Sequence, residues 1–228
     1  MSKVLVIPDM HLKSAILDLA EQILARERID KIVVLGDLLD DFYTKSEDYD
    51  DFWLAFMRFY SRYKNKIVLL YGNHEAGYLL NRGMSGTTKW GEKYAAKYAE
   101  LSPKVVHLED KITFSHAGVF DEFLRMKDLA DLPVATAIEE INALPLQNLW
   151  FDESPLWARP QYRFLHNSGE WLGCTQVIGH TPMRNIDQCG TIISADVFST
   201  DWGKKYGEEK MVVINSKTGK FTKHSLQG

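Results

Sequence analysis

Five short apolar runs in this sequence are each followed by side chains that bind metal ions or transfer protons. The runs are rich in β-branched residues, which is typical of buried strands. In layered α/β folds, ligands gather beyond the carboxyl ends of the strands, where residues far apart in the sequence meet. The segments therefore predict one composite site. They are Asp9-Met10-His11, Gly36-Asp37-Leu38-Leu39-Asp40, Gly72-Asn73-His74-Glu75, Ser115-His116-Ala117-Gly118 and Gly179-His180-Thr181-Pro182.

The order of the expected elements indicates one α/β domain over residues 1–228. With 45% apolar residues, a chain of this length can bury a full core. Helical spacing at residues 14–28 and 48–63, each between two strands, predicts β-α-β units with parallel strands and right-handed crossovers. Two helical stretches are expected within residues 121–144. The C-terminal strands are expected to be antiparallel.

Two segments are expected to shape access to the site. Residues 76–91 contain several glycines and predict a flexible loop, followed by a helix at residues 90–101. Residues 145–170 are polar, aromatic and interrupted by proline, which indicates an insertion.

Composition excludes several classes of protein. The net charge of −4 gives no basic field that would concentrate nucleic acid, so we expect no strong nucleic-acid-binding surface. No apolar run approaches the roughly 20 residues that span a bilayer, and no secretory signal is evident. Cys174 and Cys189 are too few for a disulfide framework. We expect a cytoplasmic protein without membrane association, and the sequence does not set its oligomeric state.

The donor types in the five segments suit two divalent ions. Asp9 and His11 are two residues apart, so in an extended backbone they project to the same side and can grip one ion. The carboxylate of Asp37 can bridge two cations. The predicted ligands are Asp9, His11, Asp37, Asn73, His116 and His180. This mixture of nitrogen and oxygen donors suits manganese, iron or zinc better than calcium or magnesium alone.

Two such ions, roughly 3.5–4 Å apart, can hold a bridging hydroxide and clamp a phosphoryl group during in-line attack. A serine or cysteine nucleophile is then unnecessary, and the sequence has no Gly-x-Ser-x-Gly elbow. It also has no Gly-x-x-x-x-Gly-Lys loop, so metals and side chains must bind the phosphate.

In this arrangement the chain resembles the calcineurin-like metallophosphoesterases. Gly72-Asn73-His74-Glu75, Ser115-His116-Ala117-Gly118 and Gly179-His180-Thr181-Pro182 resemble more narrowly the phosphoprotein-phosphatase branch, which includes bacterial and phage enzymes and diadenosine tetraphosphatases. The resemblance spans residues 4–196. It implies a layered α-β-β-α sandwich with mixed sheets.

The resemblance also implies a role for each site residue. Asp9 and His11 would hold the first metal, Asp37 would bridge, and Asn73, His116 and His180 would hold the second. His74 would protonate the leaving oxygen, oriented by Asp40. Arg159, in a Trp-x-Arg segment, would bind the substrate phosphate. The two divalent ions are expected to be manganese, with iron, zinc, nickel and cobalt as alternatives.

The sequence departs from the family pattern at two positions. Asp40 is followed by Asp41 and Phe42 where the protein phosphatases continue with arginine and glycine, so a phosphate-binding arginine is missing. Leu12 stands where a glycine normally follows the histidine. Arg82 and Arg163 are candidates to replace the missing arginine.

Three further polar residues are expected to have structural roles. Glu75 is expected to brace the adjoining loop, and Asp196 to make structural hydrogen bonds. His166 lies in the access segment and is expected to be structural as well.

The function expected from these features is metal-dependent hydrolysis of a phosphomonoester, with a phosphorylated substrate as partner. The alternatives within enzymes are a nucleotide or dinucleoside-polyphosphate hydrolase and a phosphatase or phosphodiesterase of nucleic-acid ends. A different class is a metal-binding scaffold without activity. His74 and Asp40 argue against a scaffold, because a scaffold needs no proton donor.

Overall fold

The computed structural model describes residues 2–159, 174–201 and 204–225, and its strands form two five-stranded sheets and one two-stranded ribbon. The first sheet has the order β12 (Phe221–Ser225), β11 (Lys210–Asn215), β1 (Lys3–Ile7), β2 (Lys31–Val34) and β3 (Ile67–Leu69). The second has the order β4 (Val106–Glu109), β5 (Ile112–Ser115), β6 (Thr175–Ile178), β8 (Ile192–Ser194) and β7 (Asp187–Cys189). The ribbon pairs β9 (Ser199–Asp201) with β10 (Lys204–Tyr206).

Each sheet contains three parallel strands. In the first, β1 pairs with β2 and β2 with β3, connected by α1 (Ala15–Arg26) and α2 (Ser46–Tyr63), as the sequence predicted. In the second, β6 lies parallel to both β5 and β8. The C-terminal strands β11 and β12 are antiparallel, also as predicted. Because parallel strands of one sheet end at the same edge, the loops after them are neighbours.

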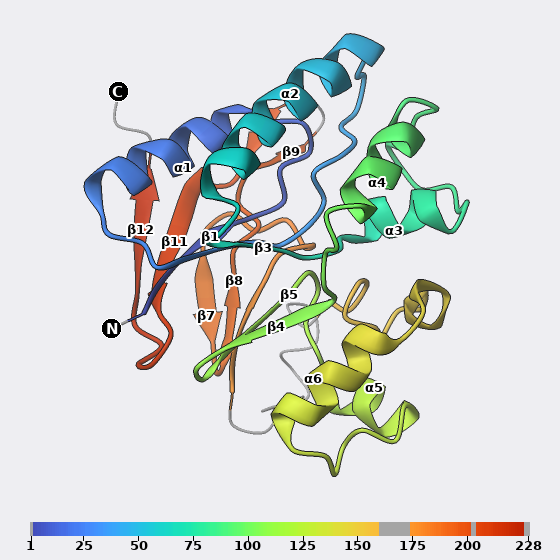
Figure 1. Ribbon diagram of the computed structural model, residues 1–228, viewed down its shortest axis with the longest axis vertical. Coiled ribbons are helices and arrows are strands. Elements are labelled where there is room, and N and C mark those ends of the chain that lie inside the picture. The colour runs from blue at the N-terminus through green and yellow to red at the C-terminus, as the bar shows by residue number, and fades with distance from the viewer. Residues whose placement is uncertain (1, 160–173, 202–203, 226–228) are drawn as a thin grey trace.

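The helices cover the two outer faces of the paired sheets. The helices α1 and α2 lie on one side, and α5 (Asp121–Met126) and α6 (Val134–Ala143) lie on the other (Figure 1). At one end, α3 (Asn73–Leu79) packs on α4 (Gly91–Ala99). These layers confirm the predicted α-β-β-α sandwich with mixed sheets. Among the described helices, none has both the length and the apolar character that crossing a membrane requires.

The core explains why these segments form helices. On α2 the buried side chains are Tyr49, Phe52, Phe56 and Phe59, spaced three or four apart. They belong to one apolar cluster that also contains side chains of both sheets. Fully burying a large apolar side chain stabilises the fold by about 1.5–3 kcal/mol, so this stripe holds α2 against the first sheet. The burial of Phe52, Phe56 and Phe59 on one face agrees with the helical spacing predicted for residues 48–63.

The main difference from the predicted elements lies at residues 73–79. The sequence indicated a flexible loop from residue 76, whereas α3 begins at Asn73 and runs through Gly77. A Cβ at Gly77 would lie 2.6 Å from Met84 Cε and 3.2 Å from Trp150 Cη2, so the glycine there serves close packing. Strands β4, β7, β9 and β10 were also not expected.

The segment predicted as an access insertion is described only in part. Its first residues form a 3-10 helix, η1 (Leu146–Leu149), and turns whose buried Leu149 and Leu156 pack with α5 and α6. Residues 160–173, which include Arg163 and His166, lie outside the described residues. Cys174 and Cys189 are free thiols, as expected.

Candidate functional site

The predicted ligands follow strands of both sheets, five of them in loops and Asn73 at the start of α3. Asp9 and His11 follow β1, Asp37 follows β2, Asn73 follows β3, His116 follows β5 and His180 follows β6. The structure brings all of them together, with Asp37 at the centre.

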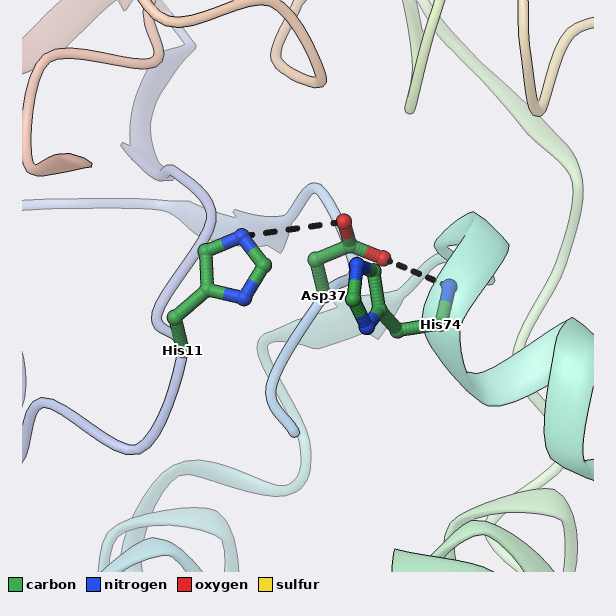
Figure 2. A group of neighbouring side chains, drawn as sticks. All are labelled: His11, Asp37 and His74. Atoms are coloured by element: carbon green, nitrogen blue, oxygen red, sulfur yellow. Dashed lines mark hydrogen bonds and ion pairs between the residues drawn. The ribbon is translucent and has the colours of Figure 1, made fainter. Parts of the chain in front are cut away.

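Asp37 is shared by two groups of donor atoms. One group contains His11, Asp37 and His74, and the other contains Asp37, His116 and His180; within each group the donor atoms lie within 4.8 Å of one another. The Oδ2 atom of Asp37 is 3.8 Å from His11 Nε2 and 3.4 Å from His116 Nε2. Figure 2 shows His11 and His74 beside the Asp37 carboxylate, whose Oδ1 accepts the His74 backbone N–H at 3.0 Å. A carboxylate between two donor groups has the position that a bridging ligand requires.

Asp9 and Asn73 lie against the second group. Asp9 Oδ2 accepts the backbone N–H of His180 at 2.9 Å and lies 4.0 Å from His116 Nδ1. Asn73 Oδ1 is 2.8 Å from His116 Nε2. The geometry therefore puts His74, and not Asp9, in the same donor group as His11.

Two histidines are oriented by backbone carbonyls. His11 Nδ1 lies 2.8 Å from the Asp40 oxygen, and His116 Nδ1 lies 2.9 Å from the Leu35 oxygen. Since a carbonyl only accepts, each Nδ1 carries a proton and donates it, so Nε2 is the nitrogen left to bind metal when the ring is neutral. A cation at His116 would therefore displace the proton that its Nε2 carries beside Asp37 and Asn73.

The backbone at the site is held in the left-handed region, which costs an L-residue roughly 1–2 kcal/mol. Asp37 has φ 47°, His11 has φ 43° and His180 has φ 64°. Close packing fixes these turns: a Cβ at Gly72 would lie 2.1 Å from Asp37 Oδ1, and a Cβ at Gly179 would lie 2.0 Å from Asp9 Oδ1. Only glycine fits where the neighbouring strands approach these carboxylates.

Glu75 stabilises the Asp37 turn, as predicted. It is fully buried, and its carboxylate accepts four backbone N–H groups. Oε2 accepts from Asp37 at 2.9 Å and Gly72 at 3.2 Å, and Oε1 accepts from Leu38 at 2.9 Å and Leu39 at 3.1 Å. Burial and the nearby Asp37 carboxylate raise the pKa of Glu75 to about 7. The four donors favour its charged form.

The donor chemistry fits divalent cations. Among the described residues, the buried side-chain polar atoms without a hydrogen-bond partner include Asp9 Oδ1 and His180 Nε2. Leaving such an atom unpaired costs about 1–3 kcal/mol, and both are good metal ligands. Burial raises the pKa of Asp9 well above its ordinary value, and the neighbouring Asp196 carboxylate raises it further. Bound cations would relieve this repulsion and provide partners for these atoms.

The imidazoles respond to the same charges. Although burial lowers the pKa of His116, the Asp37 and Asp9 carboxylates raise it to about 9. Burial and the neighbouring His116 lower the pKa of His180 well below its ordinary value. Without metal, the proton is therefore held by His116, beside the Asp37 and Asp9 carboxylates, and not by His180.

A histidine–carboxylate pair lies beside the donor groups. His74 Nδ1 is 2.8 Å from Asp40 Oδ2, and Asp40 Oδ1 accepts the hydroxyls of Tyr49 at 2.5 Å and Tyr78 at 2.6 Å. Although burial lowers the pKa of His74, the Asp37 and Asp40 carboxylates raise it to about 9. In this environment His74 is protonated at neutral pH.

Sequence reasoning missed the two tyrosines. Tyr49 continues the buried α2 stripe one turn before Phe52, so helical spacing was the signal that indicated its direction. Tyr78 had no such signal, because α3 itself was not expected.

The arginine candidates differ in position. Arg159 Nη1 lies 3.2 Å from Thr181 Oγ1 and 3.4 Å from the His180 oxygen, so it borders the second donor group. Trp157 packs edge-on against His180, with ring centroids 5.7 Å apart. Arg82 lines a different cavity from the one that His11 and His74 line.

Asp196 follows β8 and is buried. Its carboxylate accepts the Ser199 hydroxyl at 3.0 Å, which agrees with a structural hydrogen bond. Burial raises its pKa to about 6.

Comparison with known proteins identifies the family. The sequence matches the calcineurin-like phosphoesterase family model over residues 2–211. The cold-active protein tyrosine phosphatase of a psychrophilic Shewanella species has a TM-score of 0.62 and 16% identity, with 99% of this chain and 81% of that chain covered. A protein serine/threonine phosphatase from Saccharomyces cerevisiae has a TM-score of 0.59 and 13% identity, with 100% and 81% covered. A search of curated proteins found no match.

At such low identities the solved structures establish the fold alone. The family match is independent of them and covers nearly the whole chain. The chain therefore belongs to the calcineurin-like phosphoesterase family, whose members are metal-dependent hydrolases of phosphoester bonds.

Proposed function

We propose that this protein is a phosphomonoesterase of the phosphoprotein-phosphatase type that works with two divalent ions. The observation that carries the proposal is the position of Asp37 between two donor groups, with the His74–Asp40 pair beside them. Two bound ions would supply a hydroxide nucleophile at neutral pH and neutralise phosphoryl oxygens.

The ligands in this proposal are Asp9, His11, Asp37, Asn73, His116 and His180. Three imidazoles and three oxygen donors suit manganese, with iron, zinc, nickel and cobalt as alternatives. The backbone carbonyls behind His11 and His116 fix their tautomers, which raises the affinity of both rings for metal.

His74 is the proposed general acid. Its Nδ1 is held by Asp40, so its Nε2 proton is the one available for the leaving oxygen. The ring lines the cavity beside the donor groups, where a leaving group would lie. Protonating an alkoxide as it leaves contributes about 10²–10⁴-fold in rate. Tyr49 and Tyr78 support this role by fixing the Asp40 carboxylate.

Substrate binding in the proposal involves Arg159 and the segment that precedes it. The guanidinium borders His180, and the indole N–H of Trp157 is buried without a partner among the described residues. Both groups donate to oxygen, as phosphate binding requires. The names of the two phosphatases of similar fold make phosphoproteins the first substrate to test. Nucleotides, dinucleoside polyphosphates and nucleic-acid ends are the alternatives.

The test is hydrolysis of an aryl phosphate by purified protein loaded with manganese, with metal content measured in parallel. We expect turnover that a chelator abolishes and manganese restores. His74→Ala should lower kcat at least about a hundredfold, and Asp37→Ala should lower both activity and metal content. His224→Ala, on β12 and outside the site, is the matched control.

A phosphopeptide, a bis-nucleoside polyphosphate, a 2′,3′-cyclic nucleotide and a 3′-phosphorylated oligonucleotide would then separate the substrate classes. Folded protein without turnover on any of these substrates, with any of several divalent ions, would favour a binding scaffold.

A further inference from the structure

One cavity opens directly beside the proposed catalytic groups. It has a volume of about 200 Å³ and lies between the loop after β2, the loop after α3 and the ribbon β9–β10. Its lining residues are His11, Lys13, Asp40, Asp41, Phe42, His74, Ser85, Gly86, Pro182, Ser199 and Thr200. His74 is one of these lining residues, so a substrate in this cavity would lie beside the proposed general acid.

Of these lining residues, Lys13 alone has a lysine or arginine side chain and therefore a fixed positive charge. It follows His11 in the loop after β1, and its backbone N–H donates to the Met10 oxygen at 2.8 Å, which fixes the turn. It lines the cavity together with His11 and His74, so its side chain borders the proposed catalytic groups.

Asp41 holds Lys13 in place. The two charged groups are 2.9 Å apart, and the side chains are 24% and 23% exposed. Asp41 is itself fixed, because its Oδ1 accepts the Phe42 N–H at 2.8 Å and the Thr200 hydroxyl at 3.4 Å. A carboxylate alone would repel a phosphate from this cavity, whereas the pair with Lys13 is neutral.

We propose that Lys13 binds the phosphoryl group of the substrate, in place of the arginine absent after Asp40, and that Asp41 holds the ammonium until the phosphoryl group displaces it. This inference rests on the proposed function of the site. A partly exposed ion pair contributes only about 0–1 kcal/mol, so a dianionic phosphoryl group bound next to two metal ions can compete with Asp41 for the ammonium. The lysine provides a compact charge that serves phosphomonoester dianions better than diester monoanions.

The test compares four variants in the binding of inorganic phosphate to the manganese-loaded protein by calorimetry. Lys13→Met should weaken phosphate binding about tenfold or more, since hydrogen bonds to charged groups are strong. Lys13→Arg should restore most of it. Asp41→Asn should leave it unchanged or tighten it, because the competing carboxylate is gone. Lys64→Met, an exposed lysine at the end of α2, should have no effect.

Turnover provides the second measurement. Lys13→Met should raise KM for a monoester more than for a diester. Equal losses of phosphate binding in Lys13→Met and Asp41→Asn would show that the pair merely supports the loop and would overturn the inference. Unchanged binding in Lys13→Met, or no binding by the parent protein, would also overturn it.

Failure of the proposed function would give a different result. Phosphate binding that depends on Lys13, without hydrolysis of any substrate, would refute the phosphatase and leave the role of Lys13 intact. Melting temperatures of all variants would establish that each is folded.

Discussion

Replacing Glu75 with glutamine tests whether this buried carboxylate holds the Asp37 turn in place. The two side chains have nearly the same shape, but glutamine replaces one acceptor oxygen with an NH₂ donor. Each carboxylate oxygen accepts two backbone N–H groups, so either orientation of the amide leaves two buried donors without an acceptor. At about 1–3 kcal/mol for each donor, the free energy of unfolding should fall by about 2–6 kcal/mol.

The assay is urea unfolding of metal-free protein at pH 8, where Glu75, whose pKa is raised to about 7, is largely ionised. Glu92→Gln is the matched control, because Glu92 also lies in the first turn of a helix but is exposed. Its loss of stability should stay below about 1 kcal/mol. Manganese affinity should also fall in Glu75→Gln, since the Asp37 turn would relax.

A loss in Glu75→Gln no larger than that in Glu92→Gln would refute this reasoning. It would mean that water or a local rearrangement satisfies the four backbone donors without the carboxylate.

Two further predictions concern strain and pH. Leu12 has φ 61°, so Leu12→Gly should be more stable than Leu12→Ala by roughly 1 kcal/mol, because both remove the side chain and only alanine keeps a Cβ in the left-handed region; the opposite order in chemical unfolding would contradict this. Burial and the nearby Lys31 lower the pKa of His107 to about 4. The folded state therefore favours neutral His107, and the resulting stability is present above the unfolded pKa of about 6.5 and is lost as pH falls toward 4, on the order of 3 kcal/mol in all. Wild-type protein should lose more stability than His107→Gln between pH 7 and pH 4.5, and equal losses would exclude the effect.

Local patterns predicted most of the fold. The β-α-β order followed from apolar runs and helical spacing, which depend on near neighbours in the sequence. The stripe on α2 is an example, since Phe52, Phe56 and Phe59 repeat with the period of a helix and are buried as expected.

The sequence was less informative where packing between distant segments decides the structure. Gly77 resembled a flexible position, yet it lies inside α3, where the close approach of Met84 and Trp150 favours glycine. A glycine required by a neighbour and a glycine required by a turn look the same in a single sequence. Consequently the helix that carries Tyr78 to Asp40 was missed.

The candidate site also combines features that the local sequence predicts with features that depend on contacts between distant segments. The donor types were evident because each follows a predicted strand, and the contact between His74 and Asp40 came from the family resemblance. The grouping of His74 with His11 depends on loop backbones that no periodicity describes. The ion pair between Lys13 and Asp41 could not be predicted for the same reason, since it depends on the left-handed backbone turn at Asp40, with φ 68°.

The donors around Asp37 come from both sheets, and this has a consequence for the lifetime of the protein in a cell. With the proposed ions bound, the cation held by Asp37, His116 and His180 would join the two sheets, which are otherwise held together by apolar packing and a few hydrogen bonds. Loss of the metal would then lower the stability of the protein as well as its activity. It would weaken the contact between the two sheets and make proteolysis easier. The supply of the ion would then govern the lifetime of the protein as well as its activity.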